Sequence, residues 1–158
     1  METVVVGIAD GKVIKQSGKL VTYALGSCVG ICLYEPSVRL AGMAHILLPY
    51  QKDAVNQSNG YKFADMGIRL LIEEMVEQGA KKGRLTAKIA GGAEMFQNME
   101  NRPNIGLRNV RAVKEMLKKE GIPVIAEDTG ASYGRTIYFS AENGELTVKS
   151  VGRKTELL

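Results

Sequence analysis

The N-terminal third of the chain contains four strand-like segments in succession, and no segment between them is long enough for a crossover helix. The segments span residues 4–8, 19–25, 29–34 and 40–48, and glycine or proline follows each of them closely. Parallel neighbours need a connection of a dozen or more residues, so these segments predict antiparallel pairing rather than a doubly wound fold.

A helical period replaces the strand pattern after a polar loop over residues 51–60. Apolar residues recur at helical spacing over 64–76 and again over 107–117, where Leu107, Val110, Val113 and Leu117 form the predicted buried face. Further strands are predicted at 85–90 and 122–127, and a hairpin joins 136–140 to 146–151 through Asn143-Gly144. The sum, at least seven strands and two amphipathic helices, predicts an α+β fold with mostly antiparallel sheets in one domain, residues 1–158.

Composition excludes several classes of protein. The chain is 45% hydrophobic and 24% charged, which is typical of globular domains, and no apolar run approaches the roughly 18 residues that a membrane span needs. The N-terminus lacks the pattern of a secretory signal, and two cysteines without an export signal favour a reducing cytoplasm. The net charge of +4 comes from scattered basic residues without interleaved aromatics, so we expect no nucleic-acid partner and no membrane insertion.

The single histidine and one of the two cysteines stand out as candidates for chemistry. Cys28 lies between small residues directly after a predicted strand, and His45 is a polar residue within an apolar strand. A thiolate attacks carbonyl carbons well, and an imidazole can accept the thiol proton and return it to a leaving amine. Backbone N–H groups of Gly26 and Ser27 are the predicted donors to the resulting oxyanion.

Three other interpretations of these residues compete with catalysis. A free cysteine and a lone histidine are more often buried structural residues. A nucleophile elbow at residues 26–30 would need a long helix directly afterwards, whereas residues 29–34 are strand-like. Zinc held by Cys28, Cys32 and His45 would lack the usual fourth ligand, and no phosphate-binding glycine motif is present, so we expect neither metal nor cofactor.

The chain resembles the bacterial chemoreceptor glutamine deamidases, the CheD family, in five ordered motifs. They cover residues 22–30, 42–49, 89–95, 104–109, and 126–130 followed by Gly134-Arg135. One departure is Ala131, where the family often has a second glycine. The resemblance spans nearly the whole chain, and five motifs in order are far more specific than a cysteine and a histidine alone.

The resemblance implies hydrolysis of selected glutamine side chains on chemoreceptor helices to glutamate and ammonia. It implies a Cys28–His45–Thr22 site in which Thr22 orients His45 through its hydroxyl or its backbone carbonyl. It also implies a layered sandwich related to bacterial toxin deamidases, and a CheC-type phosphatase as a partner that restrains the enzyme.

Two functions from other classes remain open at this stage. The chain could be a non-catalytic adaptor that docks on receptors or on the phosphatase, or a receptor methylesterase that uses the same nucleophile. The two cysteines give a further expectation: Cys28 should be reachable and partly thiolate, with a depressed pKa, whereas Cys32 lies between apolar neighbours and should be buried and neutral.

Overall fold

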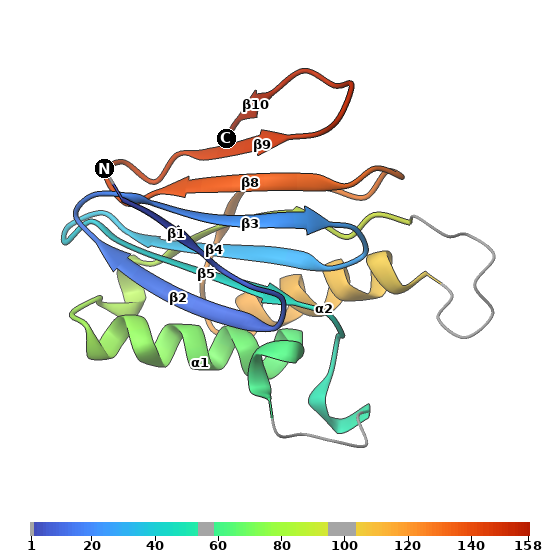
Figure 1. The fold of residues 1–158 in the computed structure, drawn as a ribbon. Coiled ribbons are helices and arrows are strands. Elements are labelled where there is room, and N and C mark those ends of the chain that lie inside the picture. Colours follow the sequence, from blue (N-terminus) through green and yellow to red (C-terminus); the bar gives the residue numbers. More distant parts are fainter. Residues whose placement is uncertain (1, 54–58, 95–103) are drawn as a thin grey trace.

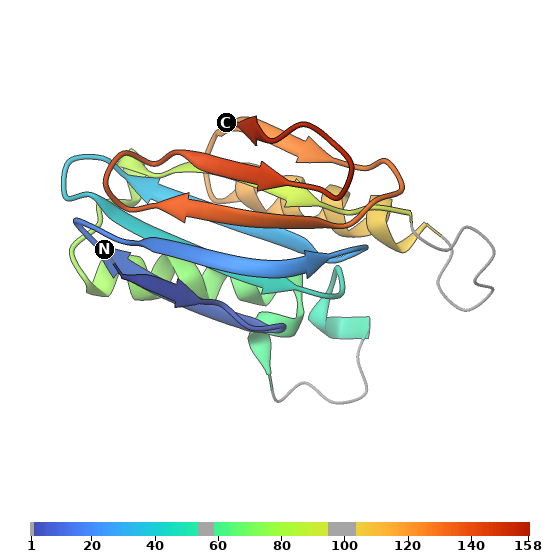
Figure 2. The same ribbon diagram turned by 45° about the horizontal axis from the view of Figure 1, so that its top comes forward.

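The computed structural model describes residues 2–53, 59–94 and 104–158, and these form three layers. Two five-stranded sheets lie face to face, and two helices cover the outer face of the second sheet (Figures 1 and 2). The first sheet has the order β1-β3-β8-β9-β10 and the second β2-β5-β4-β6-β7. Only the β1–β3 and β6–β7 pairs are parallel among these strands, which confirms the predicted α+β sandwich of mostly antiparallel sheets.

The strand bounds follow the sequence pattern closely in the middle of the chain and less well at its ends. The strands are β1 Thr3–Val5, β2 Asp10–Lys15, β3 Lys19–Leu25, β4 Val29–Glu35, β5 Leu40–Ile46, β6 Thr86–Gly91, β7 Val124–Thr129, β8 Arg135–Ser140, β9 Leu146–Lys149 and β10 Glu156–Leu157. Strands β2 and β10 were not predicted. Strand β2 carries Asp10, Lys12 and Lys15, and it forms an edge that is fixed by pairing with β5 rather than by an apolar pattern.

Helices α1 (Ala64–Glu77) and α2 (Ile105–Lys119) lie where the periodicity predicts them. Gly79, with φ +116°, follows the first helix in the left-handed region, as expected of a residue that ends a helix. The buried face of α2 differs from the prediction at one position, because Leu107 is exposed and Gly106 is buried. No helix in the described ranges is both long and apolar enough to cross a membrane.

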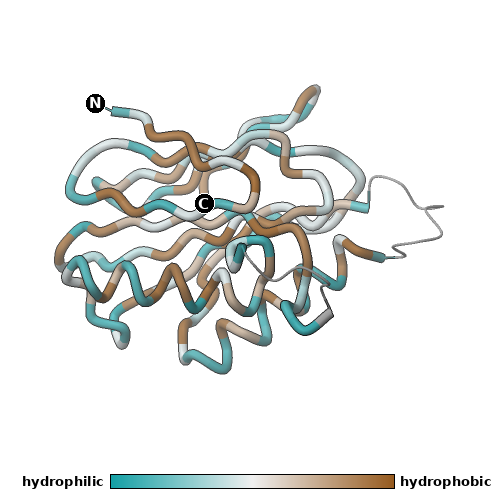
Figure 3. Tube along the Cα trace, turned by 60° about the horizontal axis from the view of Figure 1, so that its bottom comes forward, coloured by the Kyte–Doolittle hydropathy of each residue, from teal (hydrophilic) through white to brown (hydrophobic). Residues whose placement is uncertain are grey.

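Strands β4 and β5 are buried along their whole length and carry the core on both faces. One apolar cluster lies between the two sheets and includes Cys32, Met43, Ile137 and Phe139. The other lies between the second sheet and the helices and includes Ile31, Ile46, Ile68 and Val113. In Figure 3 hydrophobic colour follows the strands, and hydrophilic colour gathers at turns and on the helices. The ends of β4 and β5 therefore project from the most rigid part of the molecule.

The predicted hairpin forms between β8 and β9, although its turn is longer than an Asn-Gly pair alone would make it. The Ser140 N–H donates to the Glu145 carbonyl, and Gly144 has φ +76° whereas Asn143 does not enter the positive-φ region. Asn143 instead accepts from the Glu145 N–H through its side chain. The predicted likeness to toxin deamidases stays a prediction.

Candidate functional site

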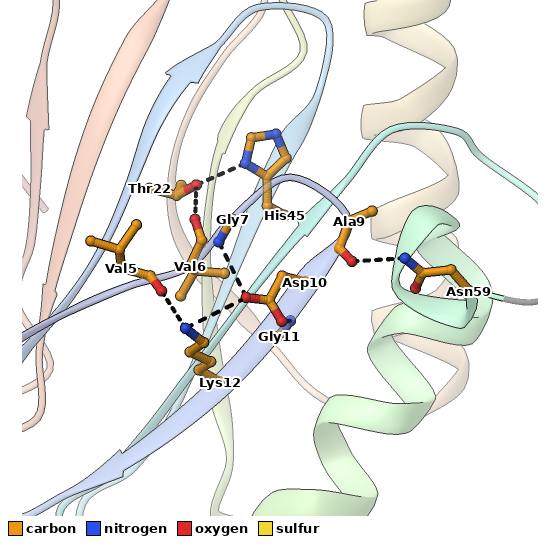
Figure 4. A network of polar contacts seen from close by, with 10 residues as sticks. All are labelled: Val5, Val6, Gly7, Ala9, Asp10, Gly11, Lys12, Thr22, His45 and Asn59. Carbon is orange, nitrogen blue, oxygen red and sulfur yellow. Dashed lines mark hydrogen bonds and ion pairs between the residues drawn. The ribbon is translucent and has the colours of Figure 1, made fainter.

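His45 lies between the two sheets in a fully buried polar contact with Thr22. The Thr22 Oγ1 and His45 Nδ1 atoms are 2.7 Å apart, and both residues are only 1% exposed. The Thr22 hydroxyl also donates to the carbonyl of Val6 at 2.8 Å. Of the two contacts that the sequence left open for Thr22, the structure therefore shows the hydroxyl (Figure 4).

The two hydrogen bonds of Thr22 fix the proton on the imidazole. A hydroxyl has one proton, and here it is given to the Val6 carbonyl, which can only accept. His45 Nδ1 must then carry a proton and donate it to Thr22 Oγ1. In the neutral ring Nε2 consequently holds a free lone pair, and this atom is buried without a hydrogen-bond partner among the described residues. The arrangement leaves the base end of the imidazole open.

The turn after β1 holds the Val6 carbonyl in place. Asp10 accepts from the N–H groups of Gly7 and Gly11, and Lys12 donates to the Val5 carbonyl at 2.7 Å. The Ala9 N–H donates to the His45 carbonyl at 2.9 Å, so the same turn is fastened to the backbone of the histidine. Figure 4 shows the contacts of Asp10 with Gly7 and of Lys12 with Val5 close to the Thr22–His45 pair.

Burial keeps His45 neutral. Desolvation lowers the pKa of His45 from 6.5 to about 4, because the charged imidazolium loses its hydration between the sheets. At neutral pH the ring is therefore available as a base, and its Nε2 lone pair is not blocked by a proton.

Cys28 lies directly before β4, on the same face of the second sheet as His45. Gly30 pairs with His45 across β4 and β5, and residues two apart in a strand point to the same side. Cys28 packs against the cluster between the sheets, which confirms that its side chain takes this side. Gly30 has no side chain between the two, and a Cβ there would lie 2.6 Å from Ile137. The register thus makes Cys28 and His45 diagonal neighbours on one face of the sheet, without a hydrogen bond between Cys28 Sγ and His45 Nε2.

The two cysteines differ in accessibility as expected, but not in the direction of the Cys28 pKa. Cys28 is half-buried and Cys32 is completely buried. Burial raises the pKa of the Cys28 thiol above its ordinary value, partly offset by its own backbone N–H, and burial also raises the pKa of Cys32 strongly. The sequence led us to expect a depressed Cys28 pKa. Neutral His45 supplies no positive charge to lower the Cys28 pKa, so the resting site holds an un-ionised thiol and a neutral imidazole.

The loop that carries Cys28 is held by three successive carbonyl groups. The Gly26 carbonyl accepts from the Ala93 N–H at 2.9 Å, and the Cys28 carbonyl accepts from the Gly92 N–H at 2.8 Å. The Ser27 carbonyl accepts from an amide side chain of α2 at 2.9 Å. With the carbonyls engaged, the N–H groups of Ser27 and Cys28 have no recorded acceptor among the described residues.

Gly91, the last residue of β6, allows this close approach. Gly91 has φ +113°, and a Cβ at this position would lie 2.3 Å from the Cys28 carbonyl oxygen. Gly92 follows with φ +68°, and together they turn the chain so that the Gly92 N–H meets Cys28. The sequence predicts a tight packing turn at Gly91-Gly92. The structure shows that this turn packs against the loop that carries Cys28.

Two buried side chains brace this end of the sandwich; both lie within resemblance motifs, but the sequence did not predict a role for them in the site. Arg135, 2% exposed, binds the carbonyls of Gly91 and Gly130 and forms an ion pair with Asp128 at 3.1 Å. Asn109, completely buried on α2, donates to the carbonyls of Ser27 and Leu47. A polar residue on the buried face of an amphipathic helix is the sequence signal that would have drawn attention to Asn109.

The structure also bears on the two rival site types. Strand β4 follows Cys28 directly, so the helix that a nucleophile elbow requires is replaced by a strand. Zinc held by Cys28, Cys32 and His45 would need three converging ligands, and no group of three such side chains lies together within the described ranges. Met95 of the third resemblance motif lies outside the described residues.

Comparison with known proteins gives a consistent family. A family model described as "CheD chemotactic sensory transduction" matches residues 47–150, a span that begins just after His45. The relative named "Probable chemoreceptor glutamine deamidase CheD" from Caldanaerobacter subterraneus subsp. tengcongensis is 56% identical over 149 residues, which is 93% of this chain and 92% of the relative. The protein of the same name from Moorella thermoacetica is 44% identical over 160 residues, 99% of this chain and 96% of its own length.

One solved structure has a more distant likeness. The crystal structure of Bacillus licheniformis hypothetical protein YfiH aligns with a TM-score of 0.48 and 15% sequence identity, over 78% of this chain and 51% of that one. The family model and the relatives cover most of the chain. On these matches, the chain belongs to the CheD family of chemotactic sensory transduction proteins.

Proposed function

We propose that this protein hydrolyses the side-chain amide of selected glutamines in chemoreceptors, giving glutamate and ammonia. Support comes from the relatives, which carry the name chemoreceptor glutamine deamidase, and from a half-buried Cys28 thiol and a buried neutral His45 on one face of the second sheet. The observation that carries the proposal is the Val6–Thr22–His45 chain of hydrogen bonds, because it leaves His45 Nε2 unpaired and unprotonated. We place the whole activity in one cytoplasmic deamidase domain, residues 1–158.

The reaction starts from the neutral pair. His45 Nε2 takes the Cys28 proton while Sγ attacks the amide carbon, which forms the carbon–sulfur bond and moves the carbonyl π electrons onto oxygen. The imidazolium gains stability from Thr22, whose oxygen accepts from Nδ1–H while its own hydroxyl proton is donated to the Val6 carbonyl. The raised Cys28 pKa agrees with this concerted transfer, since no ion pair needs to exist before substrate binds.

The tetrahedral oxyanion needs donors beside Sγ. The Ser27 N–H has no acceptor among the described residues, whereas the Cys28 N–H interacts with its own sulfur. The Gly26 N–H completes the set of candidates that the sequence suggested. The Gly26, Ser27 and Cys28 carbonyls accept hydrogen bonds from other donors. They therefore point away from the loop N–H groups and do not repel an oxyanion bound there.

Collapse of the intermediate releases ammonia and leaves a thioester. His45 returns the proton from Nε2 to the departing nitrogen, and the carbon–nitrogen bond breaks. Water then attacks the thioester, with His45 as base again, and the carbon–sulfur bond breaks to give glutamate and the Cys28 thiol. The cycle consumes one water and needs no metal or cofactor.

The test is the intact mass of a chemoreceptor cytoplasmic fragment before and after incubation with the protein, followed by peptide mapping. We expect conversion of specific glutamines to glutamates with wild type and none with Cys28→Ala. Amide and methyl-ester forms of one fragment, compared side by side, separate deamidase from methylesterase. An unmodified amide fragment with wild-type protein would contradict the proposal and favour the adaptor.

We extend the proposal to a CheC-type phosphatase as partner, on the basis of the family resemblance. If that phosphatase binds where receptor helices bind, adding it should raise the apparent KM for the receptor fragment and leave kcat unchanged. Unchanged rates at saturating phosphatase would contradict a shared surface.

A further inference from the structure

Asn109 connects the two chain segments that carry the nucleophile and the base. Its Nδ2 donates to the Ser27 carbonyl and to the Leu47 carbonyl, each at 2.9 Å. Ser27 immediately precedes Cys28, and Leu47 lies two residues after His45. The side chain is completely buried on α2, 62 residues or more away in sequence from either partner.

The chemistry of the partners fixes the orientation of this amide. Both partners are carbonyl oxygens, which only accept, so the nitrogen of Asn109 must face them and each of its two protons has a defined acceptor. The Oδ1 atom is then buried without a partner among the described residues. A buried unpaired acceptor costs free energy that an apolar side chain would avoid, so the contribution of Asn109 lies in its two donated bonds.

The helix that presents Asn109 is seated on the same part of the site. Gly106, one turn earlier, approaches the backbone after β6 so closely that a Cβ would lie 2.4 Å from the carbonyl oxygens of Gly92 and Ala93. Gly92 and Ala93 are the residues whose N–H groups hold the Cys28 and Gly26 carbonyls. Helix α2 therefore holds Asn109 in a fixed position. The two hydrogen bonds of the Asn109 side chain then set the distance between the Cys28 segment and the His45 segment.

We propose that Asn109 is a positioning residue that sets the separation of Cys28 and His45 by clamping the Ser27 and Leu47 carbonyls with one amide nitrogen. The proposal rests on the proposed function, because the two segments matter only if their side chains react together. It assigns to α2 a part in positioning the reacting groups: Asn109 is the last residue of the motif at 104–109, and it is not a member of the Cys–His–Thr set.

The first test compares Asn109 variants with a matched core variant of the same helix. Asn109→Asp keeps the size but turns a carboxylate oxygen toward two carbonyls, and Asn109→Ala removes both bonds. Val113→Ala, completely buried one turn later in the sheet–helix cluster, destabilises the same helix without touching either segment. At a temperature where circular dichroism shows all variants folded, we expect kcat for Asn109→Ala to fall about 100-fold with little change in KM, and Val113→Ala to stay near wild type.

The second test needs no receptor and separates this inference from the proposed function. The rate of Cys28 alkylation by iodoacetamide is followed between pH 5 and 9 by peptide mapping, on wild type, His45→Ala and Asn109→Ala. If the clamp positions the pair, the Asn109→Ala pH profile resembles that of His45→Ala and differs from that of Val113→Ala. This result would uphold the clamp even if wild type fails to deamidate receptors. Asn109→Ala and Val113→Ala behaving alike in both kcat and alkylation would overturn it and leave Asn109 a structural residue; if Asn109→Asp does not fold, Asn109→Ala decides alone.

Discussion

The proposed base and the proposed nucleophile of this site are held in place by different means. His45 and Thr22 come from strands of two facing sheets, are almost completely buried, and meet through a side-chain hydrogen bond. Cys28 lies in a loop, is half-buried, and is fixed by bonds to the carbonyls of its own loop. The base is thus positioned by the sandwich itself, whereas the nucleophile depends on donors from the β6–α2 region. Substitutions in the core between the sheets should therefore affect the position of His45. Substitutions in α2 and at Gly91-Gly92 should affect the position of Cys28.

Removing either reacting group should have the largest effect. Cys28→Ala eliminates the nucleophile, and His45→Ala eliminates the only buried base beside it, so each should lower kcat by roughly 10³-fold or more. Cys32→Ala is the control for the cysteine, because Cys32 is completely buried among apolar residues and should lose stability rather than turnover. Intact-mass measurement of receptor fragments gives the rates. Wild-type turnover by His45→Ala would make the histidine structural.

Acid should expose the cost of burying His45. The pKa of His45 is about 4 in the folded protein and 6.5 in the ordinary state, so between these values the unfolded chain binds a proton that the folded one does not. Stability is therefore complete above about pH 6.5 and declines as the pH falls toward 4, by about 3 kcal/mol in total.

Urea unfolding at pH 7, 5.5 and 4.5 measures this decline, with His45→Gln as the control that should lose it. Glu35 and Glu127 do not mimic the effect, because their pKa values are lowered below the ordinary carboxylate value. At Glu35 burial raises the pKa, but hydrogen bonds from Ser37 and Lys81 and the charge of Arg84 together lower it by more; at Glu127 the hydrogen bond from Lys114 is the main cause of the lowered pKa. The stability that Glu35 and Glu127 contribute is therefore lost only at a lower pH than the His45 effect. A His45→Gln protein with the same slope as wild type between pH 7 and 4.5 would place the titrating group elsewhere.

Thr22 should contribute less than the residue it orients. Thr22→Val keeps the shape but leaves His45 Nδ1–H and the Val6 carbonyl without their shared partner. An unpaired buried group costs about 1–3 kcal/mol, which corresponds to a kcat reduction of about 10- to 100-fold. Thr22→Ser retains the hydroxyl and should retain most activity in the same mass assay. Equal losses for Thr22→Val and His45→Ala would mean that the hydroxyl is as necessary as the imidazole.

The sequence could predict the parts of the site that depend on local pattern. Strand β3 was predicted with its observed bounds, and both helices were found, because apolar periodicity is a local property. The unpredicted β2 is polar and is a strand only because β5 lies beside it. The sequence marks Asn109 as a polar residue on a buried helix face, but it does not predict which backbone carbonyls Asn109 meets, because no side-chain pattern marks them. The direction of the Cys28 pKa also depends on burial, which is a property of the assembled sandwich.

The end of strand β3 links Thr22, which contacts the proposed base, to the Cys28 loop. A substitution there is the prediction with the smallest expected effect. Strand β3 contains an irregularity between Thr22 and Leu25, where Ala24 has φ +56° and is exposed. The left-handed region costs an L-residue about 1–2 kcal/mol, which glycine avoids at an entropic cost of about 0.5–1 kcal/mol. Ala24→Gly should therefore change the free energy of unfolding by less than about 1 kcal/mol, whereas Ala24→Val should destabilise more, because β-branched residues tolerate positive φ poorly.

The kcat of Ala24→Gly decides what the bulge contributes to the difference between the two regions. The Thr22 hydrogen bonds and the three carbonyl bonds of the Cys28 loop do not involve the Ala24 side chain, so we expect kcat to remain near wild type. Urea unfolding and the receptor-fragment assay on the same preparations provide both numbers. A clear loss of kcat without loss of stability would show that the stiffness of residue 24, and not only the donors from β6 and α2, holds the nucleophile against the base.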